Sequence, residues 1–373
     1  MKEKAIFLTN NIYIDKSLNE GGVRLCTEEY IDLLSKLFDI SIFPVQNRTS
    51  LVYRIQVKLG INQYNDFSVN SRMAELNDLV IKNNIKYVFL NQSNTAKFGL
   101  ALKKFWGNKV PIFICSHGNE SGDLLHSVTR FNNTLPVFRK ILANWTLGRT
   151  IRTEVNQRLN GIDGVLTVSE VEFQIENWLG AKKVFLVPRT IKMDAKYFNG
   201  SLGIVGFMGD LSHAPNYQGI KSVCDELLEI GNYEGLSVRI VGSSKDWGMA
   251  LERNYPFVNY LGYLTNEELE KECESWSFFL NPVFYYSRGV STKLAKAIGM
   301  GLPVITTTIG NRGYKWSKGI LPMVHSPKEM ANAILALAFD IGQINHYRSQ
   351  VIEIVNSSPT HQELAGQLED FIS

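Results

Sequence analysis

The chain lacks the features that mark disulfide-rich, zinc-binding and nucleic-acid-binding proteins. Its 373 residues include four cysteines, which lie far apart and form no Cys-x-x-Cys pair: Cys26, Cys115, Cys224 and Cys273. This spacing argues against a zinc site or a disulfide framework. Cys115 and Cys224 lie in apolar segments, where a buried thiol is the simpler interpretation. A formal net charge of +3 is too small to indicate a nucleic-acid partner.

Long apolar runs are also missing. No stretch reaches the roughly 20 apolar residues that a membrane-spanning helix needs. The first segment, MKEKAIFLTNNIYI, has only a short apolar run that asparagines interrupt, so we interpret it as a strand and not as a secretory signal. We therefore expect a cytoplasmic protein. With 45% hydrophobic and 20% charged residues, the composition is that of a globular protein, and the length suits two domains.

Short apolar strands alternate with helices along the chain. In the first half, helices are expected at 24–38 and 71–83, and strands at 5–8, 40–43 (closed by Pro44), 87–90, 112–115, 164–168 and 183–187. After a polar linker at 189–201, further strands are expected at 204–208, 238–241, 258–261, 278–280 and 304–306. This alternation predicts an α/β fold of parallel sheets covered on both faces. We expect two doubly wound domains that face a cleft, residues 1–187 and 188–350, and a C-terminal helix at 351–373 that packs back on the first domain.

The clearest chemical signal is the segment RGVSTKLAKAIGMGLPVIT at residues 288–306. A polar loop with Ser291 and Thr292 leads into a predicted helix that carries Lys293 in its first turn. The unpaired N–H groups and the positive dipole end of a helix attract an anion, and the lysine adds a full charge. The segment therefore predicts a phosphate-binding site.

Three other loops follow predicted strands, at the edge of the sheet where ligands bind in such folds. Gly21 and Gly22 precede the first helix and permit close backbone approach, although a glycine pair also suits a simple turn. His117 could hydrogen-bond a substrate hydroxyl or be structural. Gly209 leaves room for a diphosphate or a base. Each signal is modest alone, whereas the ordered set is specific.

Taken in order, these motifs resemble the GT-B fold glycosyltransferases, in particular the retaining family 4 (glycosyl transferases group 1). The resemblance covers nearly the whole chain and includes Ile240-Val241-Gly242, VNYLGYL at 258–264 and Asn281-Pro282. It implies a Rossmann-like enzyme that moves a sugar from a UDP-, TDP- or GDP-sugar donor to a glycan or lipid-linked glycan, with retention of configuration. By analogy, the chain suits bacterial surface polysaccharide synthesis.

The resemblance also implies roles for individual residues. Lys293 would neutralise the diphosphate as the sugar leaves, and His117 would contact the donor sugar or the acceptor. The donor-binding residues would be Gly21, Gly22, Gly209, Gly262, Tyr263, Arg288, Ser291, Thr292 and Lys296. We expect no cofactor beyond the nucleotide-sugar substrate. We also expect no metal, because the sequence has no Asp-x-Asp pair at a strand end.

The sequence departs from the family at two places. Arg288 and Lys296 stand where family 4 members commonly have a Glu-x7-Glu pair. Lys296 has only donors and cannot accept a hydrogen bond from the ribose hydroxyls, so it would contact phosphate or lie on the helix surface. Asp210 and Gln218 replace a basic pair. The nucleotide therefore stays open, and so does a second hypothesis, a catalytically silent GT-B subunit that binds a partner or an acceptor. A sugar-nucleotide epimerase fits less well, because its carboxylate and histidine set is not evident.

Two segments, 48–58 and 136–152, combine basic and apolar residues. Helices of this composition can lie on an anionic membrane surface. They equally suit ordinary helices that pack on the first sheet and keep their lysines and arginines in water. Peripheral association with the inner face of the plasma membrane is thus one of two interpretations.

Overall fold

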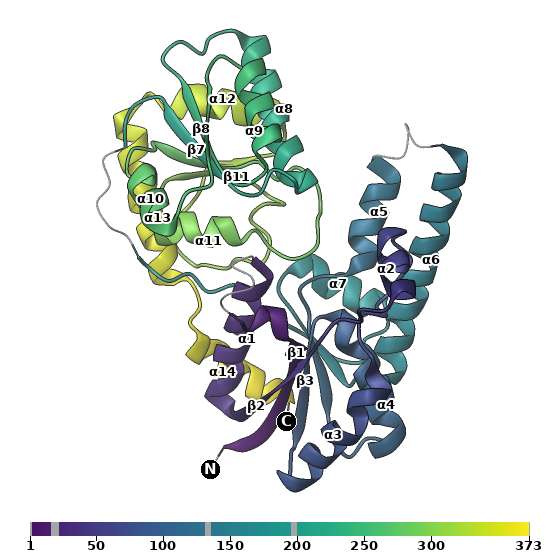
Figure 1. Ribbon diagram of the computed structural model, residues 1–373. Helices are drawn as coiled ribbons and strands as arrows, with labels where there is room; N and C mark the ends of the chain where they lie inside the picture. Colours follow the sequence, from purple (N-terminus) through teal and green to yellow (C-terminus); the bar gives the residue numbers. More distant parts are fainter. Residues whose placement is uncertain (1, 16–21, 131–135, 195–199, 373) are drawn as a thin grey trace. The chain divides into compact units, whose positions relative to one another are not determined.

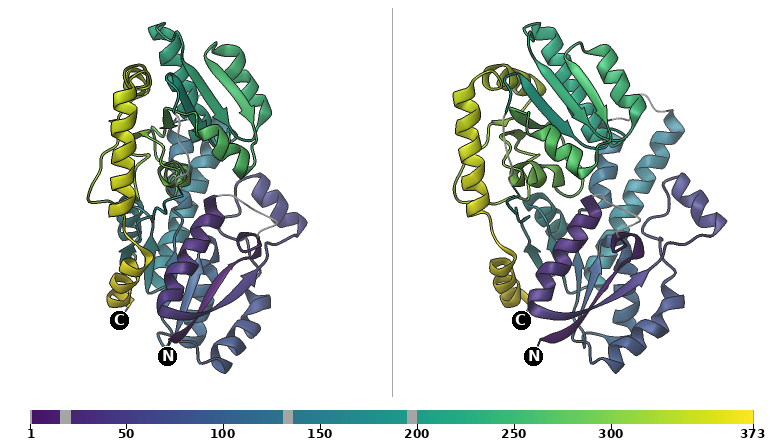
Figure 2. Two further views of the ribbon diagram at one scale, coloured as in Figure 1. Left: turned by 90° about the vertical axis from the view of Figure 1, so that its left-hand side faces the viewer. Right: turned by 60° about the vertical axis from the view of Figure 1, so that its left-hand side comes forward.

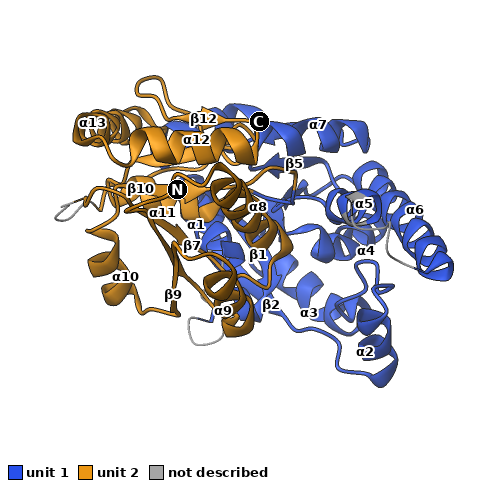
Figure 3. Cartoon of the chain, turned by 90° about the horizontal axis from the view of Figure 1, so that it is seen from above, with its two compact units in different colours: residues 1–188, 287–289, 360–373 blue, residues 189–286, 290–359 orange. Residues whose placement is uncertain are grey.

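Figure 1 shows the computed structural model, which describes residues 2–15, 22–130, 136–194 and 200–372. The chain divides into two compact units (Figure 3). Unit 1 contains residues 1–188, 287–289 and 360–373, and unit 2 contains residues 189–286 and 290–359. Each unit is built around a six-stranded sheet whose neighbouring strands all run parallel.

The sheet of unit 1 has the order β2-β1-β3-β4-β5-β6. Its strands are β1 (Glu3–Asn10), β2 (Phe38–Val45), β3 (Tyr87–Asn91), β4 (Ile112–Cys115), β5 (Gly164–Thr167) and β6 (Val184–Leu186). The helices of this unit are α1 (Gly22–Leu37), α2 (Leu51–Lys58), α3 (Val69–Lys82), α4 (Ala96–Trp106), α5 (Glu120–Arg130), α6 (Val137–Asn160), α7 (Glu170–Trp178) and α14 (His361–Ile372). Two short 3₁₀ turns, η1 (Asn11–Tyr13) and η2 (Ser93–Thr95), follow β1 and β3. Strands β3 and β4 are buried on both faces, which explains their continuous apolar sequence.

Strand β2 is longer than predicted. We expected Pro44 to close it, but the strand continues through Pro44 to Val45. Proline lacks an N–H donor and is tolerated in a strand that has a neighbour on one side only. β2 lies at the edge of the sheet and pairs with β1 alone, which is a position where proline is tolerated.

The sheet of unit 2 has the order β12-β11-β10-β7-β8-β9. Its strands are β7 (Ile204–Met208), β8 (Ser237–Val241), β9 (Val258–Gly262), β10 (Phe278–Asn281), β11 (Val304–Thr307) and β12 (Met323–Val324). Its helices are α8 (Ala214–Ile230), α9 (Lys245–Asn254), α10 (Asn266–Cys273), α11 (Thr292–Gly299), α12 (Pro327–Leu337) and α13 (Ile341–Ser357). This is the strand order of dinucleotide-binding folds. From the centre of the sheet, β7, β8 and β9 follow one another toward one edge, and β10, β11 and β12 follow one another toward the other edge. The strand order therefore reverses between β7 and β10. The sequence did not predict β12, because two residues are too few to form an alternating pattern.

Apolar side chains of unit 2 fill both faces of its sheet. In β10, Phe278 and Leu280 belong to the cluster that includes α8 and α12, whereas Phe279 belongs to the cluster that includes α11 and α13. This alternation follows from the two-residue period of a strand. Gly206 in β7 makes room for the Trp276 ring, since a Cβ at Gly206 would lie 2.0 Å from the ring carbons. The prediction of buried thiols at Cys115 and Cys224 is confirmed, and both cysteines are free.

The C-terminal segment is divided between the two units. The boundary expected at residue 350 lies inside α13, which belongs to unit 2. The chain then returns to unit 1, where α14 packs against α1 (Figure 2). An ion pair joins His361 to Asp32, and the Phe371 ring lies 5.1 Å from the ring of Phe185. α14 is therefore part of the core of unit 1.

Candidate active site

Ligands of open α/β sheets bind at the carboxyl ends of the strands, where the strand order reverses. In unit 2 this point lies between β7 and β10. Gly209 follows β7 directly, Asn281 ends β10, and Ser291 precedes α11. The loops predicted to bind a diphosphate therefore lie at the topological switch point of the second sheet.

Asn281 organises the start of α11. Its Nδ2 donates to Thr306 Oγ1 at 2.9 Å and to the Gly310 carbonyl at 3.2 Å, so its Oδ1 is left as an acceptor. The Ser291 hydroxyl donates to this oxygen at 2.9 Å. Ser291 makes no side-chain cap on the helix. The first N–H groups of α11 therefore have no side-chain acceptor from the N-cap residue and suit an anion.

Lys293 extends from the first turn of α11 toward the loop after β7. Its Nζ donates to Asn216 Oδ1 and lies 4.9 Å from the centre of the Phe207 ring. Within the described residues, this amide oxygen is its hydrogen-bond partner and no carboxylate is paired with it. Burial lowers the pKa of Lys293 to about 7. A partly buried ammonium without a carboxylate partner suits an anion.

Gly209 lies directly beside Lys293. A Cβ at Gly209 would come within 3.2 Å of Lys293 Nζ and 3.1 Å of Asn216 Nδ2. Asn216 Nδ2 in turn donates to the Asp210 carbonyl at 2.8 Å, which fixes the turn. The structure thus brings together Gly209, Ser291, Thr292 and Lys293, four of the residues predicted from the sequence.

Asp210 carries a negative charge in the same turn. Burial opposes its ionisation, but hydrogen bonds from Ser212, Ser243 and Ser244 outweigh burial and lower the pKa of Asp210 to about 2. The Ser244 hydroxyl lies 2.9 Å from Asp210 Oδ1. This carboxylate suits a sugar or ribose hydroxyl better than a phosphate.

Gly262 and Tyr263 lie at the end of β9. The Gly262 carbonyl accepts a hydrogen bond from the Gly242 N–H at 2.8 Å, and a Cβ at Gly242 would collide with the Gly209 carbonyl. The turn that contains Gly242 therefore lies between Gly262 and Gly209 and contacts both of them. Tyr263 is 70% exposed, so its ring is open to a stacking partner.

Lys296 and Arg288 have other contacts. Lys296 Nζ donates to Asn266 Oδ1 at 2.9 Å, at the first residue of α10. Arg288 belongs to unit 1, where its N–H donates to Asp123 Oδ1 at 2.6 Å and its Nε lies 3.2 Å from Asp123 Oδ2. The contact of Lys296 is thus with α10 and that of Arg288 with α5, whereas Lys293 contacts Asn216.

His117 follows β4 in unit 1. Its Nε2 lies 2.8 Å from Asn91 Oδ1. Asn91 Nδ2 donates to Thr9 Oγ1 at 2.8 Å and to Thr27 Oγ1 at 2.9 Å, which assigns Oδ1 as the acceptor and places the proton of His117 on Nε2. Asn91 ends β3, beside β1, at the switch point of the first sheet. Asn91 was not predicted as a site residue, although an asparagine that ends a buried strand is a signal that could be searched for.

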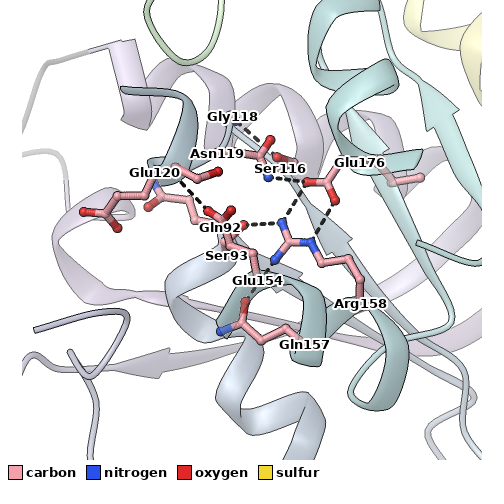
Figure 4. Close-up of polar contacts among 12 residues, drawn as sticks. Gln92, Ser93, Ser116, Gly118, Asn119, Glu120, Glu154, Gln157, Arg158 and Glu176 are labelled. Carbon is pink, nitrogen blue, oxygen red and sulfur yellow. Dashed lines mark hydrogen bonds and ion pairs between the residues drawn. The ribbon is translucent and has the colours of Figure 1, made fainter. Parts of the chain in front are cut away.

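A buried polar network supports the loop that carries His117 (Figure 4). Arg158 and Glu176 are both fully buried, with Arg158 Nε 2.8 Å and Nη2 2.7 Å from the two Glu176 oxygens. Glu176 also accepts from Asn119 Nδ2 at 3.0 Å. On the other side of the loop, Glu154 accepts from the Ser121 N–H at 3.2 Å. Charged residues on helices usually face water, so the sequence pattern did not reveal this network.

Three further expectations concern the glycine pair, a metal and a membrane-spanning helix. Gly21 lies outside the described residues, and Gly22 is the first residue of α1. Among the described residues, no group of three or more histidine, cysteine or acidic side chains is arranged to hold a metal ion. None of the described helices is both long and apolar enough to cross a bilayer.

The comparison with protein families agrees with this geometry. Residues 203–340, which form most of unit 2, match the family "Glycosyl transferases group 1". The chain is thus similar to this family over that segment. No curated protein matches the sequence of the chain.

Solved structures show the same fold over 77 to 100% of the chain. Sucrose-phosphate synthase from Thermosynechococcus elongatus is similar over 100% of this chain and 98% of its own, with a TM-score of 0.67 and 15% identity. A UDP-forming α,α-trehalose-phosphate synthase from Burkholderia xenovorans is similar over 100% of both chains, with a TM-score of 0.60 and 11% identity. S. aureus TarM, crystallised with fondaparinux, α-GlcNAc-glycerol and UDP, is similar over 77% of this chain and 55% of its own, with a TM-score of 0.53 and 16% identity.

The predicted GT-B fold of two doubly wound units is thereby confirmed. The comparisons also support the glycosyltransferase class. Membership of the retaining family 4 and the cleft between the domains stay predictions, because identities of this size establish the fold alone.

Proposed function

We propose that the protein transfers a sugar from a nucleotide-sugar donor to a glycan or lipid-linked glycan acceptor, with retention of configuration. The observation that carries the proposal is the position of Lys293 in unit 2. Its ammonium lies beside Gly209 at the switch point of a sheet with dinucleotide-binding order, and its described partner is a neutral amide. A diphosphate is the ligand that satisfies both the helix start and this charge.

The diphosphate would bind at the first turn of α11. The N–H groups of Thr292 and Lys293 and the hydroxyl of Thr292 would donate to its oxygens, while Lys293 would neutralise the charge that develops on the leaving group. These groups are fixed before the reaction, since Asn281 holds Ser291 and Asn216 holds Lys293. We propose that they suffice without a divalent metal.

His117 would serve the sugar or the acceptor. Its Nε2 lies 2.8 Å from Asn91 Oδ1, so the ring is held in one orientation. In the proposed reaction, a fixed imidazole hydrogen-bonds a hydroxyl of the reacting sugar or the acceptor. Asn91 is then a positioning residue for His117.

The base and the ribose would lie toward β9, where Tyr263 is exposed beside Gly262. Lys296 donates to Asn266 and offers no acceptor for the ribose hydroxyls. We therefore propose that the site accepts UDP-, TDP- or GDP-sugars with weak discrimination at the 2′-position. By analogy, we propose that the protein acts in bacterial surface polysaccharide synthesis. It would then meet a lipid-linked acceptor at the inner face of the plasma membrane.

A donor panel tests the proposal. Release of the nucleoside diphosphate is measured for UDP-, TDP- and GDP-sugars, in chelator and with manganese or magnesium, and the Lys293→Ala variant is the matched negative control. Release from at least one donor that depends on Lys293 is the expected result. If nucleotides bind but no donor is turned over with any acceptor, the catalytically silent subunit is the correct alternative. Activity that requires the metal would contradict metal independence.

A further inference from the structure

A cavity of about 430 Å³ lies in unit 1 at the end of β2. It forms where the chain after β2 runs beside the segment that precedes α3. Asn47 and Phe67 make an antiparallel bridge there, and the Arg48 N–H donates to the Asp66 carbonyl at 2.7 Å. The buried rings of Phe67 and Phe98 give the cavity an apolar part, whereas most of its other lining residues are polar.

Two arginines line this cavity, and none of the described residues that line it is an aspartate or a glutamate. Arg48 is partly buried, and its Nε donates to the Ser68 hydroxyl at 3.3 Å. The Arg72 guanidinium lies 4.7 Å from the centre of the Phe43 ring and pairs with the exposed carboxylate of Glu75. The described partner of the Arg48 side chain is therefore a hydroxyl and not a carboxylate, so its charge is available to a ligand.

Lys97 adds positive charge beside Arg48. Burial lowers the pKa of Lys97, and repulsion from the Arg48 guanidinium lowers it further. The Asp66 carboxylate opposes this effect on the pKa, but it already accepts from the Tyr53 hydroxyl at 2.6 Å and from Asn62 Nδ2 at 2.9 Å. The side of unit 1 around Arg48 thus has an excess of positive charge.

Two helices begin at the same cavity. Ser50 and Ser68, the N-cap residues of α2 and α3, both line it. Ser68 makes no side-chain cap on α3. The start of a helix carries a partial positive charge and N–H groups without partners inside the helix. Both helix starts therefore reinforce the two arginines, and the serine hydroxyls add further donors, so the cavity suits an anion.

The cavity lies at the edge of the first sheet that also carries His117. Strands β2, β1, β3 and β4 are neighbours in this order and run parallel, so their carboxyl ends share one edge. Asn10, which ends β1, donates to Asn47 Oδ1 at 2.9 Å, and Asn91, which ends β3, contacts His117. Two strand spacings separate β2 from β3, which is about 10 Å. A phosphorylated sugar spans a distance of this order.

We propose that this cavity binds the phosphate monoester of a phosphorylated sugar, and that this sugar is the acceptor. The inference rests on the proposed function, because it assigns the acceptor of that reaction. A phosphate monoester carries about 1.5 to 2 negative charges at neutral pH, which match Arg48 and Arg72, whereas a phosphodiester carries one. The planar guanidinium of Arg48 donates to two phosphate oxygens at once, which also favours phosphate.

The experiment is calorimetric titration of the whole chain with inorganic phosphate, glucose 6-phosphate and dimethyl phosphate, with glucose as the uncharged control. We expect the first two to bind, dimethyl phosphate to bind about tenfold more weakly, and glucose to show no binding. Arg48→Gln should bind glucose 6-phosphate about tenfold more weakly, because charge-assisted hydrogen bonds are lost. Ser71→Asp places a negative charge at the cavity and should weaken binding at least as much. Lys82→Gln, at the exposed far end of α3, is the matched control and should change nothing.

Circular dichroism and thermal melting of each variant separate lost binding from lost folding. The proposal is wrong if neither phosphate nor glucose 6-phosphate binds, if dimethyl phosphate binds as tightly as glucose 6-phosphate, or if folded Arg48→Gln binds like the wild type. If Arg48→Gln does not fold, Ser71→Asp decides by the same criterion. Binding that is lost in Lys293→Ala and kept in Arg48→Gln would place the phosphate at the candidate donor site, which also overturns the proposal.

The two proposals fail in different ways. Phosphate binding is measured without a donor, and nucleoside diphosphate release is measured without a phosphorylated sugar. A protein that releases nucleoside diphosphate but binds neither phosphate nor glucose 6-phosphate contradicts the acceptor site alone. A protein that binds glucose 6-phosphate through Arg48 but turns over no donor contradicts the proposed function.

Discussion

At the scale of single residues, the candidate donor site depends on one cation in an unusual setting. Lys293 has lost much of its hydration, which lowers its pKa to about 7, and its described hydrogen-bond partner is the neutral amide of Asn216. The ordinary pKa of a lysine is near 10.5. Its charge is therefore available to a ligand, and the free protein at neutral pH is close to losing it.

Replacement of Lys293 by alanine should weaken binding of UDP by about 1.5–3 kcal/mol, because a hydrogen bond to a charged group is lost. Lys296→Ala is the matched control on the same helix, since that lysine contacts Asn266 and should change binding by less than about 0.5 kcal/mol. Isothermal titration calorimetry with UDP and with uridine measures both. An equal loss for uridine would show that Lys293 does not serve the phosphates.

The lowered pKa of Lys293 also predicts a pH dependence of binding. Above pH 7 the free lysine is increasingly neutral, whereas the diphosphate favours the charged form and raises its pKa in the complex. Binding should therefore take up about one proton at pH 8–9, and the affinity should fall as pH rises above 7. Calorimetry in buffers of different ionisation enthalpy measures the uptake. Unchanged uptake in Lys293→Ala would assign the proton to another group.

Lys296 leads to a prediction about the nucleotide. Without an acceptor at this position, UDP and TDP should bind with affinities within about a factor of ten, or about 1.4 kcal/mol. In Lys296→Glu, a new carboxylate could accept from the 2′-hydroxyl, and the preference should move toward UDP. The affinities of both nucleotides for both proteins decide this. A wild type that strongly prefers UDP would mean that another residue, such as Asp210, holds the ribose.

At the scale of elements, unit 1 is held together near His117 by buried charges. Arg158 of α6 and Glu176 of α7 form an ion pair with both side chains inaccessible to water, and Glu176 also holds Asn119 of the loop. A buried pair contributes little net stability compared with apolar residues, but a single remaining charge is costly. The network therefore constrains the loop more than it stabilises the fold.

Glu176→Ala should lower the free energy of unfolding by about 3–5 kcal/mol, because Arg158 would remain buried without its counter-charge. The matched control is Glu75→Ala, which breaks the exposed pair with Arg72 and should cost less than about 1 kcal/mol. Urea denaturation measures both. The double variant Arg158→Met/Glu176→Leu should recover most of the loss; if it does not, the penalty comes from packing and not from the unpaired charge.

At the scale of the whole molecule, the chain leaves unit 1 after residue 188, contributes residues 287–289 to it, and returns to it at residue 360. α14 buries Leu364, Ala365, Leu368 and Ile372 in unit 1. α14 is thus a structural part of the same unit as β1, and the two segments of unit 2 lie between them in the sequence.

Truncation after Ser358 removes α14 and should destabilise unit 1, because the apolar residues that α14 covers become exposed to water. The loss should be about 2 kcal/mol for each buried leucine of α14. UDP binding should persist, because Gly209 and Lys293 both belong to unit 2. Thermal melting and UDP titration of the truncated chain test the two parts, with Gln367→Ala, an exposed position on α14, as the control. A loss of UDP binding together with an unchanged melting temperature would contradict this division.

The sequence alone determined the periodic and local features. Apolar runs fixed the main strands, and the polar loop before Lys293 predicted a helix start with a nearby charge, because both depend on neighbours in the chain. Tertiary structure decided the rest. Asn91 and Asn281 became organising groups only because parallel strands bring distant side chains to one edge, and Arg288 pairs with Asp123, 165 positions away along the sequence. Val137, Phe138 and Ile141 at the start of α6 fit a buried helix equally well by sequence, and only the fold showed that they are exposed, since burial depends on what packs against a helix and not on its own pattern.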